Sequence, residues 1–303
     1  MDLRNKVAIV TGSGQGLGLA YARALAGLGA SVIVNDLDEG TAEAAARTIR
    51  ESGGSAQAVA GAVGSTGTAE TLVEAAVERF GRLDALVTNA GVLRDKVVWK
   101  MTDEDFDQVI NVHLRGTFTC VRAAARRMRE QGEGGRIICV GSPAGQRGNF
   151  GQTNYSGAKA GILGMVRTWA MELARSGITV NAVVPVAATA MTETVPFLKS
   201  YVDTMSEGGE LPAFARRELG FGSPDDAAGA VAFLASDEAA DVTGQAVGIG
   251  GDRLALWSHP DMTVRAFHDG GWDAAAIAEE WPSTFAAQQE SVGAQIPEEV
   301  QDK

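Results

Sequence analysis

Short runs of apolar and β-branched residues alternate with longer alanine-rich stretches along most of the chain. The short runs predict seven strands, at Val7–Thr11, Ser31–Asp36, Ala56–Val63, Ala85–Asn89, Arg136–Ser142, Thr179–Val184 and Ala246–Ile249. The stretches between them predict helices at Leu17–Leu28, Gly40–Ser52, Thr68–Phe80, Asp103–Gln131, Asn154–Ser176 and Pro224–Ser236. Strand, helix, strand at this rhythm predicts an α/β fold: one doubly wound domain with a seven-stranded parallel sheet and helices on both faces.

Residues 186–222 interrupt this rhythm. The segment is too long for an ordinary connection between a strand and a helix. It is rich in large apolar and aromatic side chains, namely Met191, Phe197, Tyr201, Met205 and Phe214. We therefore expect a substrate lid built from short helices, with a disordered insertion as the alternative.

The chain continues beyond the predicted domain, which spans residues 1–251. Residues 252–303 hold three of the five tryptophans, Trp257, Trp272 and Trp281, and end in acidic residues. Because an indole ring is costly to leave in water, we expect this C-terminal extension to pack on the body or on a partner subunit.

Composition narrows the class of protein. The chain has 303 residues, with no evident linker or repeat, and its 38 glycines are scattered among apolar runs, as in tight turns. A formal net charge of −12 argues against a nucleic-acid partner. Cys120 and Cys139 lie in apolar surroundings without metal or redox spacing, and no apolar run approaches the ~20 residues of a membrane span. We expect a cytoplasmic protein with no membrane partner and no secretion signal.

A glycine-rich segment, Thr11-Gly-Ser-Gly-Gln-Gly-Leu-Gly18, follows the first strand and opens the first helix. Gly12 allows a tight turn, Gly16 lets the backbone approach a pyrophosphate, and Gly18 lets helix and strand pack closely. A phosphate group then sits at the helix N-terminus. In this position the segment predicts the dinucleotide site of a Rossmann-type domain, and a purely structural turn is the alternative.

Asp36 ends the second predicted strand, where an acid accepts hydrogen bonds from a ribose diol. No lysine or arginine occurs between Arg23 and Arg47, so nothing local can pair with a 2′-phosphate. This favours NAD over NADP. The alternative is that Asp36 caps the helix starting near Gly40, a role that Asp38 could also take.

Tyr155 and Lys159 are four residues apart on a predicted helix, so their side chains share one face. An ammonium beside a phenol favours the phenolate and lowers the phenol pKa from its usual value of about 10. The pair therefore predicts a proton-transfer catalyst. The spacing alone is weak evidence, and the glycine-rich segment supplies its context.

Together these residues resemble the short-chain dehydrogenase/reductase family over about residues 5–251. The marks are the glycine-rich segment, Asn89-Ala90-Gly91, Asn111, Ser142, Tyr155 and Lys159, in family order. Within the family, the sequence is most similar to the (3R)-hydroxyacyl-CoA dehydrogenase (17β-hydroxysteroid dehydrogenase type) part of peroxisomal multifunctional enzyme type 2. That likeness rests on Val34–Leu37, Val112–Gly116, Gly148–Tyr155 and Pro185–Thr192.

Two positions depart from many relatives. Val186 follows Pro185 where relatives such as bacterial 3-oxoacyl-carrier-protein reductases have Pro-Gly. Ala62 precedes Val63 where many relatives have an aspartate that contacts adenine. The first departure weakens assignment to those reductases, and the second implies that the adenine contact is missing or replaced.

The resemblance implies a role for each marked residue. Tyr155 would be the general base, Lys159 would hold it ionised and bond the nicotinamide ribose, and Ser142 would hydrogen-bond the substrate oxygen. Asn111 would mark a helix kink that holds a water touching the lysine. Judged alone, Ser142 could be a turn or cap residue and Asn111 a helix-bending residue. The implied cofactor contacts are Gly12, Gln15, Gly16, Leu17, Gly18, Asp36, Val63, Asn89, Ala90, Gly91, Tyr155, Lys159, Pro185 and Thr189.

The expected function is an NAD-dependent oxidoreductase that interconverts a secondary alcohol and a ketone, on a (3R)-hydroxyacyl-CoA or a 17β-hydroxysteroid. The alternatives are an NADPH-dependent 3-oxoacyl thioester reductase and, in another class, a non-catalytic NAD-binding regulator.

We expect a homodimer or homotetramer. We also expect no metal, because His259 and His268 lack ligand spacing. Arg94, Lys96, Lys100 and Arg147 are candidate contacts for coenzyme A phosphates, with ordinary surface charge as the alternative. We expect His113 to be a core or surface histidine.

Overall fold

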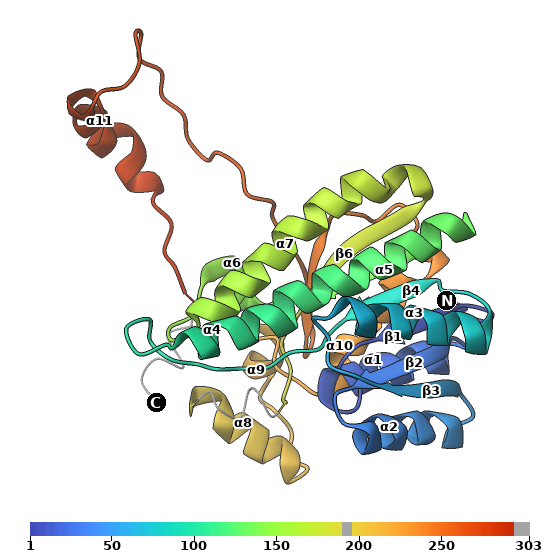
Figure 1. The fold of residues 1–303 in the computed structure, drawn as a ribbon. Helices are drawn as coiled ribbons and strands as arrows, with labels where there is room; N and C mark the ends of the chain where they lie inside the picture. The colour runs from blue at the N-terminus through green and yellow to red at the C-terminus, as the bar shows by residue number, and fades with distance from the viewer. Residues whose placement is uncertain (190–195, 294–303) are drawn as a thin grey trace.

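The computed structural model describes residues 1–189 and 196–293, and its centre is one eight-stranded sheet in the order β3-β2-β1-β4-β5-β6-β7-β8 (Figure 1). The strands are β1 (Val7–Val10), β2 (Ser31–Asp36), β3 (Ser55–Ala60), β4 (Ala85–Thr88), β5 (Gly135–Val140), β6 (Ile178–Pro185), β7 (Ala246–Gly250) and β8 (Arg253–Trp257). Strands β1 to β7 pair in parallel, and β8 pairs antiparallel to β7. The predicted doubly wound α/β fold is therefore confirmed.

Alternation along each strand divides the apolar side chains between two core layers. Ala8 and Val10 of β1 belong to one buried cluster, and Val7 and Ile9 belong to the other. Since successive side chains on a strand point to opposite faces, a short apolar run fills both layers at once. This is why fully buried parallel strands lack a polar face in the sequence.

Helices cover both faces of the sheet. One layer contains α1 (Gly16–Gly27), α2 (Glu39–Glu51) and α10 (Pro224–Ala235), and the other contains α3 (Thr66–Phe80), α5 (Gly116–Gln131) and α7 (Thr153–Leu173). Each predicted helix is present within a few residues of its expected limits. No helix in the described ranges is long and apolar enough to cross a membrane.

The eighth strand, β8, is an addition to the predicted seven-stranded parallel sheet. It lies inside the segment that the sequence assigned to the C-terminal extension, and Trp257 pairs with Ala246 of β7. Gly250 and Gly251 have positive φ values of 155° and 52°, which fold the chain into a tight hairpin. Leu254 and Leu256 point to solvent, so β8 lacks the buried apolar run of central strands such as β1 and β4.

The long helix predicted at Asp103–Gln131 is divided into three parts. It comprises α4 (Asp103–Val109), a π-helical turn η1 (Ile110–Arg115) and α5. A capping box between Thr102 and Asp105 fixes its start. Such π-turns occur frequently at functional sites, and this one contains Asn111.

The region between β6 and α10 contains the predicted short helices, α8 (Pro196–Ser206) and α9 (Ala213–Arg217). The amide of Ala188 donates to the carbonyl of Gly222 at 2.7 Å, which brings the two ends of the region together. Met191 and the side chain of Phe197, two of the apolar residues that suggested a lid, lie outside what the structure describes.

After β8 the chain leaves the body, forms the short helix α11 (Ala274–Glu280), and returns (Figure 1). A π-helical turn (Trp281–Phe285) and a 3-10 turn (Ala286–Gln288) follow α11. None of residues 252–293 is buried. Trp257 of β8 packs partly buried against the core, whereas Trp272 and Trp281 are exposed within one chain.

Candidate active site

The glycine-rich segment lies at the carboxyl ends of the strands, at the point where strand order changes direction. From β1 the sheet grows through β2 and β3 on one side and through β4, β5 and β6 on the other. In open α/β sheets, ligands bind in the crevice outside such a switch point. The fold thus places the segment where a dinucleotide site is expected.

Three glycines of this segment are required by close contacts or by backbone conformation. Gly12 and Gly16 have φ values of +59° and +55°, which side chains other than glycine rarely adopt. A Cβ on Gly12 would lie 2.6 Å from the Cα of Ala90, and one on Gly18 would lie 2.1 Å from the carbonyl oxygen of Gly12. A purely structural turn accounts for the positive φ at Gly12 and Gly16 and for the close contact at Gly18, and the exposed backbone at Gly16 also has the room that a ligand needs.

Asn89 and Ala90 hold this loop from the neighbouring strand β4. The Asn89 Nδ2 donates to the carbonyl oxygens of Gly12 at 2.8 Å and Thr11 at 3.1 Å. The Thr11 hydroxyl in turn accepts from the backbone amides of Asn89 and Ala90. Asn89 therefore acts here by fixing the loop.

Asp36 ends β2 beside the same loop. Its carboxylate accepts from the amides of Gly14 at 3.1 Å and Leu37 at 2.8 Å. The alternative role, capping of the next helix, belongs to Asp38, whose carboxylate accepts from the Thr41 amide and hydroxyl, each at 2.7 Å. The cap interpretation of Asp36 is wrong, and its carboxylate faces the glycine-rich loop.

The remaining predicted cofactor residues lie on different elements around the loop. Gln15 is the exposed residue before α1, and Leu17 lies in its first turn. Pro185 ends β6, and the Thr189 Cγ2 is 4.0 Å from where a Gly16 Cβ would lie. Val63 is buried, and a Cβ on Gly116 would lie 2.8 Å from its Cγ2, so its side chain is part of the core. The donor-rich loop, the acid at β2 and the helix N-terminus fit a nicotinamide dinucleotide.

Tyr155 and Lys159 share one face of α7, as their spacing predicted. The Lys159 Nζ is 5.6 Å from the centre of the Tyr155 ring. Lys159 is buried, and its Nζ donates to the carbonyl oxygen of Val140, at the end of β5, at 2.6 Å. The ammonium is therefore anchored to the sheet and covered by the phenol ring.

The pKa shifts at this pair differ from the expected direction. Burial raises the pKa of Tyr155 above its usual value, a hydrogen bond with Ser142 opposes that rise, and the charge of Asp95 adds to it. Burial also lowers the pKa of Lys159 to about 8. Loss of hydration is the largest cause of both shifts, and it moves the pKa of Tyr155 in the direction opposite to the one that the spacing predicted.

Ser142 combines two roles that the sequence left as alternatives. Its hydroxyl oxygen accepts from the Ala144 amide at 3.2 Å and thereby caps α6 (Pro143–Arg147), a helix that the sequence did not predict. Since the cap uses an acceptor lone pair, the hydroxyl hydrogen remains for the hydrogen bond with Tyr155. A serine before a proline was the available signal for this helix start.

Asn111 lies in the π-turn η1, which confirms a helix irregularity at this position. A Cβ on Gly64 would lie 2.9 Å from both the Asn111 Nδ2 and its carbonyl oxygen, so Gly64 gives the turn its room. Asn111 itself is exposed. The water relay through Asn111 stays a prediction.

His113, to which the sequence gave no site role, lies at the centre of the site. It is buried, its Nε2 is 2.8 Å from the Val92 carbonyl oxygen and 3.0 Å from the Val92 amide, and its ring meets Tyr155 edge-on. A Cβ on Gly91 would lie 2.3 Å from the imidazole Cε1. Burial and then the charge of Lys159 lower the pKa of His113 to about 3, so the ring is neutral. The position of His113 beside Tyr155 could be seen only in the fold, because the π-turn η1 sets the direction of the His113 side chain.

The four candidate contacts for coenzyme A phosphates have different surroundings. The Lys96 Nζ pairs with the Asp105 carboxylate at 2.7 Å. Arg147 binds residues of the C-terminal extension through its guanidinium. Arg94 donates to the carbonyl of the preceding Leu93, and Lys100 is exposed.

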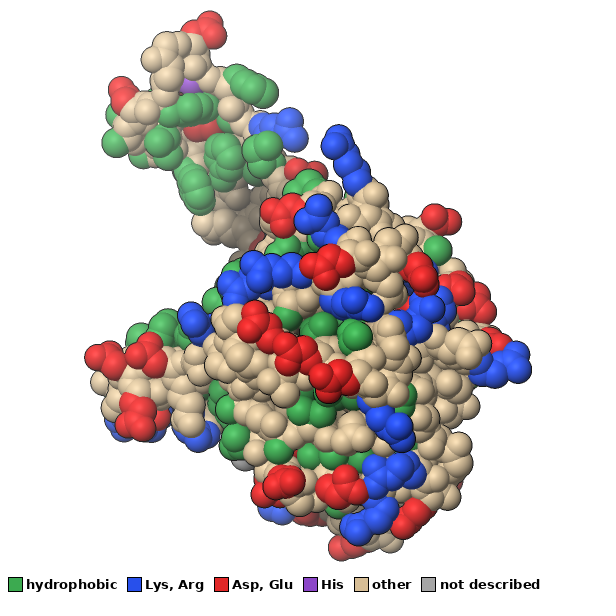
Figure 2. Space-filling view, turned by 45° about the vertical axis from the view of Figure 1, so that its right-hand side comes forward, with side chains coloured by type: hydrophobic (Ala, Val, Ile, Leu, Met, Phe, Trp, Pro, Cys, Tyr) green, Lys and Arg blue, Asp and Glu red, His purple; other side chains and the backbone are tan. Residues whose placement is uncertain are grey.

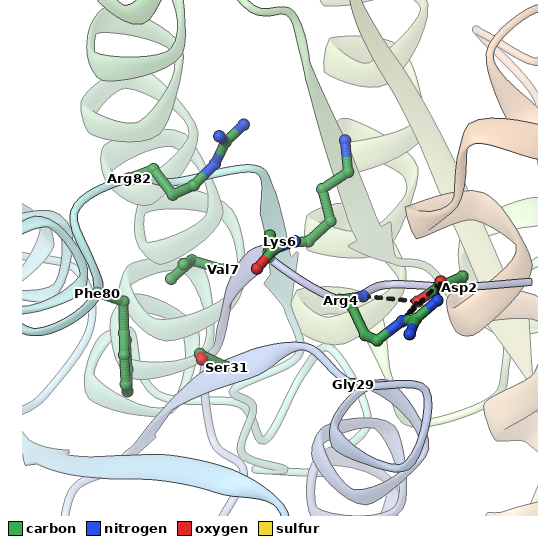
Figure 3. Close-up of a pocket in the computed structure, with 9 residues that line it drawn as sticks. Asp2, Arg4, Lys6, Val7, Gly29, Ser31, Phe80 and Arg82 are labelled. Carbon is green, nitrogen blue, oxygen red and sulfur yellow. Dashed lines mark hydrogen bonds and ion pairs between the residues drawn. The ribbon is translucent and has the colours of Figure 1, made fainter.

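A separate hollow of about 720 Å³ lies at the opposite, amino-terminal edge of the sheet (Figure 3). Val7 and Ser31, the first residues of β1 and β2, line it. Its cations are already paired: Arg4 with Asp2, Lys6 with Asp237, and Arg82 with Asp84 and Glu133. This hollow is not at the ligand-binding edge of the sheet.

Within residues 1–189 and 196–293, no cluster of side chains could hold a metal ion.

Comparison with known proteins agrees with this geometry. A family model described as short chain dehydrogenase matches residues 6–197. The chain is 39% identical over 253 residues to 3-oxoacyl-(acyl-carrier-protein) reductase FabG of Thermotoga maritima, covering 83% of this chain and 98% of the relative. It is 39% identical over 286 residues to hydroxyacyl-CoA dehydrogenase ChsB1 of Mycobacterium tuberculosis, covering 90% and 86%. A crystal structure of a short chain dehydrogenase from Mycobacterium avium aligns with a TM-score of 0.83 at 34% identity, over 97% of this chain and all of that one.

Proposed function

The chain belongs to the short-chain dehydrogenase family, whose members are oxidoreductases that act on CH–OH groups with a nicotinamide cofactor, and from this we propose its reaction and site residues. The proposed reaction interconverts a secondary alcohol and a ketone, with Tyr155 as the general base. The observation that carries it is the convergence of Ser142, Tyr155 and Lys159 at the carboxyl edge of the sheet.

In the oxidation direction, Tyr155 accepts the proton of the substrate hydroxyl. The Ser142 hydroxyl donates a hydrogen bond to the same oxygen. This bond holds the oxygen in place and stabilises the negative charge that develops on it. Lys159, held by Val140, stabilises the phenolate that takes the proton. When bound, the nicotinamide ring supplies the hydride acceptor. Asn111 at the π-turn connects the lysine to solvent in this proposal.

The proposed cofactor is NAD, and Asp36 supports it. A 2′-phosphate near this position would meet a carboxylate, with no lysine or arginine between Arg23 and Arg47 to balance it. The ratio of kcat/KM with NAD to kcat/KM with NADP tests the proposal. A strong NADP preference would refute the Asp36 argument without affecting the Tyr155 mechanism.

The proposed substrate is a (3R)-hydroxyacyl-CoA, with a 17β-hydroxysteroid as the second large secondary alcohol that the sequence likeness to peroxisomal multifunctional enzyme type 2 implies. The relative named hydroxyacyl-CoA dehydrogenase supports the thioester. Arg94 and Lys100, which are exposed, remain the candidate contacts for coenzyme A phosphates, because Lys96 is ion-paired with Asp105 and Arg147 is bonded to the C-terminal extension.

The second candidate is an NADPH-dependent 3-oxoacyl thioester reductase. It is favoured by relatives named 3-oxoacyl-(acyl-carrier-protein) reductase, one 39% and another 41% identical to this chain. A panel of hydroxyacyl-CoAs, 3-oxoacyl thioesters on CoA and on carrier protein, and steroid alcohols separates the candidates. Turnover is followed by absorbance of the reduced cofactor, and the highest kcat/KM identifies substrate and direction. No turnover of any panel member would favour the non-catalytic NAD-binding regulator.

The segment 186–222 is proposed as a lid over this substrate. Its ends meet through Ala188 and Gly222, and its helices α8 and α9 lie between β6, which carries Pro185, and α10. We further propose a homodimer or homotetramer in solution.

A further inference from the structure

The segment from 258 to 290, called the arm here, stands away from the body of its own chain (Figure 1). Figure 2 shows a concentration of apolar side chains on it. No residue of the arm is buried, and Phe267, Trp272 and Trp281 are 90%, 38% and 43% exposed. An apolar surface of this kind on a soluble chain marks an interaction site.

The arm has local order without a core of its own. Asp273 caps α11 by accepting from the Ala276 amide at 2.8 Å. The rings of Trp281 and Phe285 stack at 5.3 Å, and His268 lies 5.1 Å from Trp272. A helix of seven residues is marginal in water, since isolated helices need about 12–15 residues. Its stability therefore depends on a surface outside the arm.

Both ends of the arm are tied to the chain that carries it. The His259 Nε2 is 2.9 Å from the carbonyl oxygen of Gly244 at one end. At the other, the Arg147 guanidinium donates to the carbonyl oxygens of Gly293 at 3.0 Å and Ser291 at 2.8 Å, and the Gly293 amide donates back to the Arg147 carbonyl at 2.7 Å. Both ends of the arm are therefore held at fixed places on the body, so the arm presents its apolar side chains at a defined position to a partner.

The partner that fits is a second copy of this chain, and the edge strand β8 is the reason. The arm leaves directly from β8, whose Leu254 and Leu256 are 72% and 69% exposed. One chain thus carries both an uncovered apolar arm and an uncovered apolar strand surface. Two copies related by a two-fold axis can cover both kinds of surface at once, because such an interface places each patch against its complement twice.

We propose that the arm packs against β8 and its surroundings on a second copy of this chain. This inference is independent of the proposed substrate and cofactor. It also links assembly to the active site, because Arg147 is the last residue of α6, the helix that Ser142 caps. The chain at the returning end of the arm is therefore hydrogen-bonded to the last residue of the helix that begins after Ser142.

The first test measures the mass of the full-length protein by sedimentation velocity over a range of concentrations. We expect a dimer or larger assembly for the natural chain. The double variant Trp272→Ala/Trp281→Ala should shift the midpoint of dissociation to at least tenfold higher concentration. Trp99→Ala is the matched control, since Trp99 is 74% exposed and lies outside the arm. A monomer throughout the range, or a double variant that assembles like the control, would overturn the proposal.

A second test identifies the surface that receives the arm. Leu256→Ala should weaken assembly alone, and it should add little when combined with Trp272→Ala/Trp281→Ala, because both changes remove the same contact. Fully additive effects would overturn the assignment to β8. Circular dichroism and thermal unfolding at low concentration check that each variant folds. We expect all of them to fold, because the substituted side chains are exposed and not part of the core.

Discussion

The imidazole of His113 stands edge-on against the phenol ring of Tyr155, with ring centroids 5.1 Å apart and planes at 86°. The same imidazole fills the space above Gly91 and bonds the backbone of Val92. One neutral ring therefore spans the distance between the loop at the end of β4 and the proposed base. It sets where the phenol ring can lie relative to that loop.

Replacement of His113 should separate this ring contact from its hydrogen bond. His113→Phe keeps a ring edge against Tyr155 but leaves the Val92 carbonyl unpaired, which costs about 1–3 kcal/mol of stability. We expect His113→Ala to lower kcat much more than His113→Phe, with the KM for the dinucleotide changed less. Equal kcat values for the two variants, measured at saturating substrate, would contradict a positioning role.

His113 should also make stability depend on pH. Its pKa is about 3 when folded, below the unfolded value of about 6.5, so the unfolded chain binds more protons in this window. The free energy of unfolding should therefore fall as pH falls from about 6.5 towards 3. In His113→Phe that part of the pH dependence should be absent from denaturant melts, and an unchanged profile would show that other groups cause it.

Tyr155→Phe removes one hydroxyl and leaves the ring that covers Lys159. Turnover should fall by at least ~100-fold, because the proton acceptor is lost, while affinity for NAD changes little. Initial rates and a calorimetric titration with NAD check the two halves of this prediction. Retained turnover would refute the proposed mechanism, and lost NAD binding would assign the phenol to cofactor affinity.

Lys159→Met should stabilise the fold around neutral pH while abolishing activity. Burial lowers the pKa of Lys159 from 10.5 to about 8, so the charged ammonium is disfavoured in the folded state. The unfolded chain binds more protons between these values, and the natural protein loses stability as pH falls through this window. The melting temperature of the variant minus that of the natural chain should be larger at pH 7 than at pH 10. A difference independent of pH would contradict the shift.

Asp36→Ala should lower kcat/KM with NAD and raise the preference for NADP, because it removes the proposed acceptor for the ribose diol and a charge that repels a 2′-phosphate. Asp38→Ala is the matched control. It removes the cap of α2, two residues away, and should lower the melting temperature without changing the ratio of the two cofactors. Equal changes of that ratio in both variants would count against a specific role for Asp36.

The sequence by itself determined the features that depend on spacing along one element. The apolar runs located the central strands because both faces of a parallel sheet are buried there, whereas the edge strand β3 is largely exposed. The glycines at 12, 16 and 18 predicted a loop that only residues without a side chain can form, and four residues of helix placed Tyr155 and Lys159 on one face.

Tertiary structure alone decided what depends on burial and on contacts between distant segments. The strand β8 has no buried apolar run and exists because β7 offers a pairing edge. The π-turn that directs His113 into the site, and the bond from Arg147 to Gly293, join residues that no spacing relates. The pKa directions of Tyr155 and Lys159 followed from loss of hydration, which depends on the whole fold around them and not on the residues beside them in sequence.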